Sequence, residues 1–307
     1  MDKKNTIQPF EKGDVIVACT VRNNPDDDHA GDGRILQYDS DLNEKGVLWI
    51  KNTTHLVNGL TFSPDDMLWA FDQHIHVAIK IDPKTGEEHL VEGLVPRSLS
   101  SVNFMADGSM IFGEHLRSDK DLPGTHAKAI NDTGAIGEGK IFKFDPAGKL
   151  VGEYQPEIHG GIAGFLGVTS ALLLPDDRTL LYVTETSNEV RRFDVVDGKQ
   201  LSPLATYPEG REGFVFFLAY MPDGRIMLSR GAKIEFLNPE TGAVESTMPQ
   251  EGFGWAVISG ANDNEHIYSG NFFTGEVAKF RISDGAKVAS VELNAERALA
   301  GVAQYRG

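Results

Sequence analysis

The stretch from Val57 to Gly86, "VNGLTFSPDDMLWAFDQHIHVAIKIDPKTG", alternates apolar runs with short polar turns. The first run breaks at a Pro-Asp-Asp turn around Asp65, and a second run of aromatic and β-branched residues follows it. A third run ends at Asp82, before the turn "PKTG". Apolar runs joined by turns of this composition are typical of antiparallel β-hairpins. The stretch therefore predicts three consecutive strands.

Looser copies of this stretch return along the chain with a period of roughly 40 to 50 residues, which is the spacing of β-propeller blades. Their turns lie near Asp65, Asp107, Asp176, Asp223 and Asn264. The one long step reflects an insert at 115–139. Each copy ends in a fourth strand, and four antiparallel strands make a blade. The copies cover Val57–Gly93, Ser100–Gln155, Thr169–Tyr207, Phe216–Pro249 and Trp255–Leu293.

The two ends of the chain together supply a sixth copy. "DVIVACT", "GRILQYD" and "GVLWIKN" predict three strands that lack an inner one, and "LAGVAQYRG" at the other end has the pattern of an inner strand. Pairing of Leu299–Tyr305 with Asp14–Thr20 would close the ring and remove exposed sheet edges. We therefore predict an all-β, six-bladed propeller over residues 14–307, preceded by an N-terminal extension at 1–13.

Composition narrows the classes of partner. The 307 residues carry a formal net charge of -16 with no basic cluster, which argues against nucleic acid or an anionic membrane as partner. No uncharged apolar run approaches the roughly 20 residues of a membrane helix, and "MDKKNTIQPF" lacks an apolar leader core. The single cysteine, Cys19, is predicted to be buried filler. A soluble protein of the reducing cytoplasm is the expectation.

"NGLTFSPDD" and "LLYVTETSNEVRRFDV" resemble motifs of the senescence-marker-protein and gluconolactonase family, six-bladed propellers related to strictosidine-synthase-like proteins. The resemblance covers most of the chain from about Asp14, but it rests on scaffold motifs, which support the fold more than an activity. It implies a divalent metal at the channel mouth, held by Glu, Asn and Asp side chains.

The positions that match those ligands differ in this chain. Ser100 and Thr169 stand where the family has Asn, Phe216 stands where it has Asp, and "LAGVAQY" offers no Glu. Hydroxyl and apolar groups do not hold a divalent ion as carboxylates do. We therefore predict neither metal nor cofactor; a ligand alignment in error would instead leave a metal-dependent lactonase or esterase.

The candidates for acid–base chemistry lie in loops at one end of the predicted channel. That face collects seven of the nine histidines: His29, His55, His74, His76, His115, His126 and His159. Glu114 and His115 end the second strand of their blade, and Glu185 has the equivalent place in the next blade. A carboxylate and an imidazole can exchange a proton with water or a substrate carbon. The predicted catalytic set is Glu114, His115, His126, His159 and Glu185. The alternative is that surface loops simply collect polar residues and that Glu114 caps a loop or pairs with Arg117.

The same face is rich in aromatic residues, which favours an apolar or aromatic ligand. The aromatic residues assigned to it are Phe165, Phe216, Phe217, Trp255, Phe272 and Phe273. The predicted substrate-binding set is His55, Asn58, His76, Ser100, Thr169, Phe216, Arg230, Trp255, Asn271 and Phe272. Arg230 is expected to bind a substrate carboxylate or to neutralise a nearby glutamate. The insert at 115–139 is expected to act as a lid or to be a surface loop.

These residues predict a lactonase-like propeller enzyme, a hydrolase or lyase that acts on a small, partly aromatic molecule without metal. The alternative is a propeller that binds a small molecule or a protein without catalysis.

Overall fold

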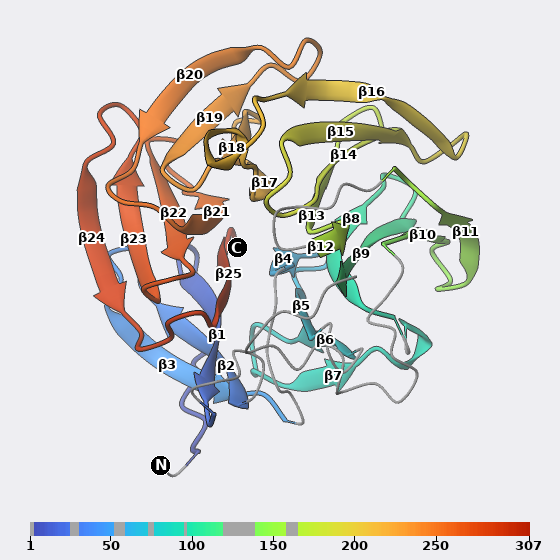
Figure 1. Ribbon diagram of the computed structural model, residues 1–307. Coiled ribbons are helices and arrows are strands. Elements are labelled where there is room, and N and C mark those ends of the chain that lie inside the picture. The colour runs from blue at the N-terminus through green and yellow to red at the C-terminus, as the bar shows by residue number, and fades with distance from the viewer. Residues whose placement is uncertain are drawn as a thin grey trace.

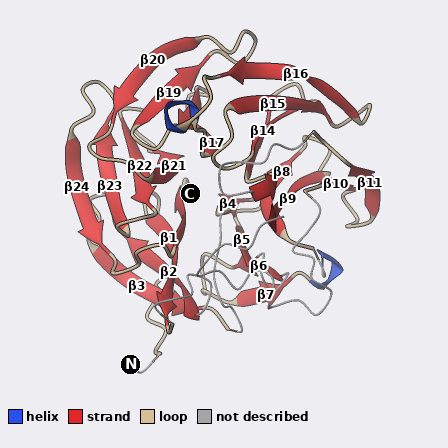
Figure 2. Ribbon diagram, in the orientation of Figure 1, coloured by secondary structure: helices blue, strands red, loops and turns tan. Residues whose placement is uncertain are grey.

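In the computed structural model the chain forms six antiparallel sheets, five of four strands and one of five, arranged around a central axis (Figure 1). The structure describes residues 3–24, 31–51, 59–72, 77–94, 97–118, 139–157 and 165–307. Strands dominate these residues, and their helical content is two short 3-10 turns, η1 (Glu92–Leu94) and η2 (Arg211–Gly213) (Figure 2). The predicted six-bladed propeller is confirmed. In the described part no helix has the length and apolarity needed to cross a membrane.

We number the blades along the chain, with strands given from the inside outward. Blade 1 is β25 (Leu299–Gln304), β1 (Val15–Arg22), β2 (Gly31–Tyr38) and β3 (Glu44–Trp49). Blade 2 is β4 (Thr61–Phe62), β5 (Leu68–Asp72), β6 (Val77–Ile81) and β7 (Glu88–Leu90). Blade 3 is β8 (Leu99–Phe104), β9 (Met110–Ser118), β10 (Ile141–Phe144) and β11 (Leu150–Tyr154).

The remaining blades repeat the arrangement. Blade 4 is β13 (Ser170–Leu173), β14 (Thr179–Val183), β15 (Glu189–Asp194) and β16 (Lys199–Thr206). Blade 5 is β17 (Phe217–Tyr220), β18 (Ile226–Ser229), β19 (Lys233–Leu237) and β20 (Val244–Pro249). Blade 6 is β21 (Trp255–Gly260), β22 (His266–Asn271), β23 (Glu276–Arg281) and β24 (Lys287–Glu292).

The core lies between neighbouring blades rather than within them. Successive side chains of a strand point to opposite faces of its sheet, so each blade presents one apolar set to each neighbour. In β1, Val15, Val17 and Cys19 pack towards blade 6, whereas Ile16 and Ala18 pack towards blade 2. Cys19 is fully buried, and burial raises the pKa of its thiol, so the prediction of buried filler is confirmed.

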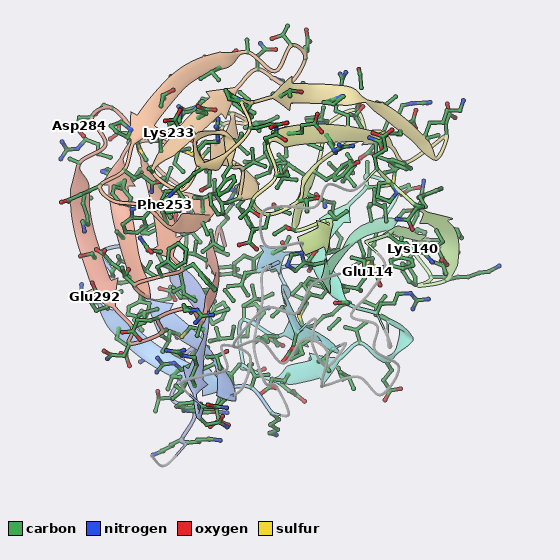
Figure 3. All side chains as sticks on the ribbon, in the orientation of Figure 1. Glu114, Lys140, Lys233, Phe253, Asp284 and Glu292 are labelled. Atoms are coloured by element: carbon green, nitrogen blue, oxygen red, sulfur yellow. The ribbon has the colours of Figure 1, made fainter. Side chains whose placement is uncertain are left out.

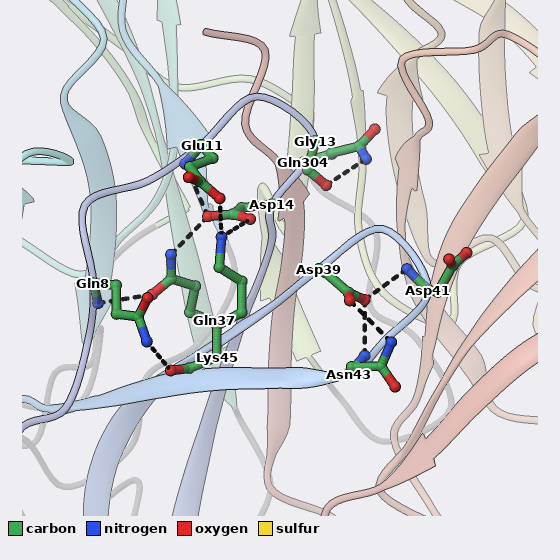
Figure 4. A network of polar contacts seen from close by, with 10 residues as sticks. All are labelled: Gln8, Glu11, Gly13, Asp14, Gln37, Asp39, Asp41, Asn43, Lys45 and Gln304. Atoms are coloured by element: carbon green, nitrogen blue, oxygen red, sulfur yellow. Dashed lines mark hydrogen bonds and ion pairs between the residues drawn. The ribbon is translucent and has the colours of Figure 1, made fainter.

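The ring is closed as predicted, by pairing of β25 with β1 from Val15↔Gln304 to Cys19↔Leu299. A polar network secures this seam (Figure 4). The Asp14 carboxylate accepts hydrogen bonds from Gln37 Nε2 at 2.6 Å and from the Glu11 N–H at 2.9 Å, and it lies 2.7 Å from Lys45 Nζ. Gln304 Nε2 donates to the Gly13 carbonyl at 2.7 Å. We call Asp14, Gln37, Lys45 and Gln304 the closure latch.

Blade 3 departs from the repeat. β9 continues past its pairing with β8, and a short extra strand, β12 (Phe165–Gly167), pairs with the extension from Ser118↔Phe165 to His115↔Gly167. The repeats predicted from the sequence leave residues 156–168 without a strand. A three-residue strand carries too few apolar alternations to be recognised from sequence, and it forms because the extended β9 offers unpaired backbone groups.

Candidate functional site

The two ends of the channel differ in construction. One face, which we call the turn face, carries the tight turns that follow the inner strands. Several of these turns are closed by an aspartate that accepts backbone N–H groups two or three residues on, as Asp176 does from Arg178 and Thr179. The opposite face, the loop face, carries the longer connections into the inner strands and between second and third strands, where the predicted site lies.

Five phenylalanines form a continuous cluster on the loop face. We call Phe214, Phe216, Phe253, Phe272 and Phe273 the aromatic rim. Neighbouring rings stand 6.3 Å apart for Phe214–Phe216, 5.9 Å for Phe216–Phe253, 6.3 Å for Phe253–Phe273 and 5.7 Å for Phe272–Phe273. They come from three loops: β16–β17, β20–β21 and β22–β23. The rim therefore joins blades 5 and 6.

Part of the aromatic rim faces solvent. Phe273 is 52% exposed, Phe214, Phe253 and Phe272 are half-buried, and Phe216 is buried beneath them. Exposed aromatic clusters of this kind on a loop surface are typical of ligand or partner sites. Phe216, Phe272 and Phe273 were predicted on this face from the sequence, whereas Phe214 and Phe253 were not.

Two glycines make the ring packing possible. Gly231 has φ +79°, and a Cβ there would lie 2.8 Å from Phe216 and 2.9 Å from Phe253. Gly254 has φ +108°, and a Cβ there would lie 2.5 Å from Phe273. Both the left-handed backbone and the close approach require glycine. A repeated Glu-Gly-Phe, at 212–214 and 251–253, is the sequence signal that could have revealed the two missed rings.

Arg211 lies against this rim. Its guanidinium carbon is 3.9 Å from the centre of the Phe253 ring, a cation–π distance. The residue is exposed, and its side chain makes no ion pair or hydrogen bond with the residues that the structure describes. Stacking uses the flat face of the guanidinium and leaves its edge N–H groups available. Arg211 is not among the site residues predicted from the sequence.

Arg230, expected either to hold a substrate carboxylate or to neutralise Glu185 or Glu212, is part of the scaffold and pairs with a different glutamate. Its side chain is 3% exposed and donates Nε to the Phe214 carbonyl at 2.7 Å and Nη2 to the Glu212 carbonyl at 2.6 Å. Nη1 lies 2.8 Å from Glu235 Oε2, and the guanidinium stacks on the Tyr207 ring at 3.6 Å. Its donors are thus directed at the loop that carries Phe214 and Arg211.

The electrostatics of this cluster follow from burial and pairing. Burial alone would raise the pKa of Glu235, but the hydrogen bond from Lys233 and the charge of Arg230 outweigh it, so the pKa lies below its usual value. Burial raises the pKa of Tyr207, and the neighbouring Glu235 charge adds to this. Both groups therefore keep one charge state near neutral pH, as suits a structural cluster.

Glu185 is the predicted catalytic residue whose loop contacts the rim loop directly. It is half-buried, and its N–H donates to Thr169 Oγ1 at 2.8 Å. The Thr186 N–H donates to the Val215 carbonyl at 3.1 Å, and the Val215 N–H donates to the Ser187 carbonyl at 2.9 Å. The β14–β15 loop and the β16–β17 loop are thus joined by backbone hydrogen bonds.

Glu114 and His115 lie elsewhere on the ring, in blade 3. Both are buried, at 5% and 3% exposure, and Glu114 Oε2 accepts the Lys140 N–H at 3.1 Å. Consecutive strand residues point to opposite faces, so the two side chains leave β9 in different directions. Figure 3 shows Phe253 and Glu114 on opposite sides of the ring, with blade 4 between their blades. This separation does not favour a shared role at the rim.

Three further predicted substrate-binding residues are engaged in the scaffold. Ser100 is fully buried and donates its hydroxyl to the Val168 carbonyl at 2.6 Å. Thr169 holds the Glu185 backbone, as described above. Trp255 is 1% exposed and donates its indole N–H to the Glu251 carbonyl at 2.8 Å. We do not retain these residues as ligand contacts.

Asn271 positions the rim rather than lining an open site. Its Nδ2 donates to the Phe253 carbonyl at 3.1 Å, and its Oδ1 accepts the Phe273 N–H at 3.0 Å. It is 4% exposed. Five further predicted residues lie outside the described residues: His55, Asn58, His76, His126 and His159. The predicted lid is outside them as well from 119 to 138.

The centre of the ring contains a cavity of about 520 Å³ lined by the inner strands of all six blades. Its lining includes Phe217, which the sequence analysis placed at the mouth of the loop face. The lining continues to Asp66 and Arg306 at the turn face, the end of the channel where no site was predicted. Among the described residues, no group of three or more His, Cys, Asp or Glu side chains is arranged to hold a metal ion.

No protein-family model and no curated protein matches the chain by sequence. Solved structures do match in fold. A chain of a nidogen/laminin complex aligns with a TM-score of 0.63 at 11% identity, covering 95% of this chain and 98% of that one. Virginiamycin B lyase from Staphylococcus aureus aligns with a TM-score of 0.51 at 14% identity, covering 81% of this chain and 74% of that one. At these identities the likeness establishes the propeller fold alone.

Proposed function

We propose that this propeller binds a small molecule carrying an aromatic or apolar ring at the aromatic rim and acts on it as a hydrolase or lyase. The observation that carries the proposal is the rim itself, with half-buried and exposed rings from three loops on one face. A ligand ring stacked between or beside such rings gains both apolar burial and favourable ring geometry.

Glu185 is the residue that we assign to the chemistry. Its loop is hydrogen-bonded to the rim loop, and the next residue, Thr186, has φ 60°, a conformation that non-glycine residues rarely adopt. Backbone strain of this kind often accompanies functional loops. As general base, Glu185 would take a proton from a water attacking an acyl carbon, or from the carbon next to the one that bears a leaving group, so that a double bond forms as that group departs. The departing group would receive the proton in either case.

The fold is compatible with either reaction. A lyase is among the proteins that share this architecture, so elimination is tested beside hydrolysis. The fold likeness does not by itself choose between them.

A binding propeller without catalysis is the second candidate. It is favoured by the burial of Glu114 and His115 and by the structural use of Arg230 and Ser100. The aromatic rim serves as the binding surface in both cases, so only turnover separates the two candidates.

The experiment screens aryl esters, lactones and aromatic substrates with a β-leaving group for turnover, and measures ring binding by ligand-observed NMR. We expect Glu185→Gln to reduce turnover by about 10² to 10⁴ with binding retained. We expect Phe253→Ala to weaken binding by about three- to tenfold. Matched controls are Glu245→Gln and Leu90→Ala, an exposed carboxylate and an exposed apolar side chain on outer strands.

Binding without turnover, with Glu185→Gln silent, would select the non-catalytic candidate. Ring binding that is indifferent to Phe253→Ala would overturn the assignment of the rim.

A further inference from the structure

We infer that the ligand of the aromatic rim is a monoanion, an aromatic or alicyclic carboxylic acid whose carboxylate is bound by Arg211. This inference rests on the proposed function and specifies its ligand class. It follows from the charge, the contacts and the support of one side chain.

Arg211 is an exposed cation in a strongly acidic protein. The protein carries 45 acidic against 29 basic residues, and Glu209, Glu212 and Glu251 are exposed in the same pair of loops. Nevertheless the Arg211 guanidinium forms no ion pair with any described residue and lies instead on Phe253. In so acidic a surface, a cation left with open donors is available to an external anion.

A second arginine that stacks on a phenylalanine, Arg225, is paired with a carboxylate of the protein. Arg225 also lies over a phenylalanine, Phe236, at 5.1 Å, but its guanidinium pairs with Asp223 at 2.8 Å. Arg225 belongs to the turn face, and its guanidinium is paired within the protein. Arg211 has the same ring contact on the loop face without the carboxylate, and a ligand carboxylate would complete the same arrangement.

The loop that presents Arg211 is held firmly. Arg230 hydrogen-bonds the carbonyls of Glu212 and Phe214, which lie on either side of Gly213. Gly213 is buried, and a Cβ there would lie 1.7 Å from the Pro208 carbonyl oxygen. A preorganised guanidinium loses less entropy when a ligand binds than one on a mobile loop.

The geometry also suggests the kind of anion. A guanidinium edge matches the two oxygens of a carboxylate, and the adjacent rings match an apolar body. One guanidinium amid surplus negative charge suits a single charge better than the double charge of a phosphate monoester.

The test uses 3-phenylpropionate and its neutral amide, two probes of the same shape, with binding followed by ligand-observed NMR. The wild-type protein should bind the acid about five- to tenfold more tightly than the amide, a preference that falls in high salt. Arg211→Met, which keeps an apolar contact with Phe253, should abolish the preference and leave amide binding intact. Arg225→Met should retain the preference. Unfolding midpoints confirm that each variant is folded.

Each outcome has a distinct meaning. Equal binding of acid and amide by the wild-type protein, or a preference that survives in Arg211→Met, would overturn the inference while the proposed ring site stands. If neither probe binds, the inference and the proposed ring site both fail.

Discussion

The closure latch and the aromatic rim use polar side chains in opposite ways. In the latch, the Asp14 carboxylate has three donors, and the two ends of the chain are joined through Gln304 (Figure 4). At the rim, Arg211 keeps its edge donors open and Phe273 remains 52% exposed. The polar groups of the latch stabilise the fold, whereas the Arg211 donors at the rim are available to a ligand.

The two regions are linked by a common device, the buried charge. Asp14 and Arg230 are both buried, and each is satisfied by several partners within the protein. Asp14 secures the ring seam, while Arg230 secures a loop whose neighbour stays open. Mutations should therefore separate into those that cost stability and those that cost binding.

The largest effect should follow deletion of residues 299–307. This removes β25, which pairs with β1 along its length and fills the seam between blades 6 and 1. An open ring exposes a strand edge and half of a core layer. We expect loss of cooperative unfolding in urea and tendency to aggregate. Deletion of residues 306–307 alone should be tolerated, and a folded protein lacking β25 would contradict the closure.

The next effect should come from Asp14→Ala. Removal of a buried carboxylate leaves Gln37 Nε2 without its acceptor and Lys45 with Glu11 as its remaining charged partner. This costs about 3 kcal/mol, the lower end for a buried pair, because Lys45 is partly exposed and keeps that second partner. Equilibrium urea unfolding measures the change. The control is Asp41→Ala, whose exposed carboxylate lies 3.6 Å from Lys279 and should contribute less than about 0.5 kcal/mol. Similar losses in both variants would remove the special role of the latch.

Much of the fold could be predicted from sequence because its cause is local and repeated. Turns such as that at Asp176 and apolar runs such as that in β1 recur along the chain, and both depend on neighbouring residues. The closing strand was predictable because the first copy lacked an inner strand. β12 was not, since it forms only against the extended end of β9.

The site was predicted less well, because the roles of polar residues depend on distant partners. The sequence places both Arg211 and Arg230 near the loop face, but only the structure shows that Arg230 is enclosed by Glu235, Tyr207 and two carbonyls. Adjacent letters also mislead: Glu114 and His115 are neighbours in sequence and diverge in space. The gathering of these loops at one end of the channel was therefore predictable, and the contacts of individual side chains were not.

Arg230→Met tests whether a buried charge that stabilises the scaffold also supports ligand binding at the aromatic rim. Loss of the guanidinium leaves two loop carbonyls without donors and Glu235 with Lys233 as its remaining charged partner, which should cost about 2 kcal/mol. It should also weaken ring binding, because the loop that carries Phe214 is no longer fixed. Arg211→Met, by contrast, should change stability by less than about 0.5 kcal/mol. Amide hydrogen exchange at Phe214 should rise in the first variant alone. If Arg230→Met left amide exchange at Phe214 and ring binding unchanged, the hydrogen bonds from Arg230 to this loop would have no role in ligand binding.

The smallest expected effect is a loss of stability in acid, because carboxylates in the turns stabilise the fold only while they are ionised. Burial alone would raise the pKa of Asp194, but the Asp197 N–H, the Arg178 guanidinium and the Val196 N–H outweigh it and lower the pKa below 3.8. The folded protein thus binds this proton less tightly than the unfolded chain does. Its contribution is complete above the unfolded pKa and is lost as pH falls through the folded value, a decline that begins below about pH 5.

The pKa values of Asp176 and Asp223, in the turns of blades 4 and 5, are likewise lowered from their usual value. Urea unfolding at pH 5, 4 and 3 should therefore show falling stability, and Asp194→Asn should make the decline shallower because one such carboxylate is gone. Arg211→Met should leave the slope unchanged, since no shifted carboxylate among the described residues pairs with Arg211. An equal slope in wild type and Asp194→Asn would show that this turn carboxylate contributes nothing to acid sensitivity. The contrast between the turn face and the rim would then rest only on Arg225, which is paired with Asp223, and Arg211, which has no ion pair with a described residue.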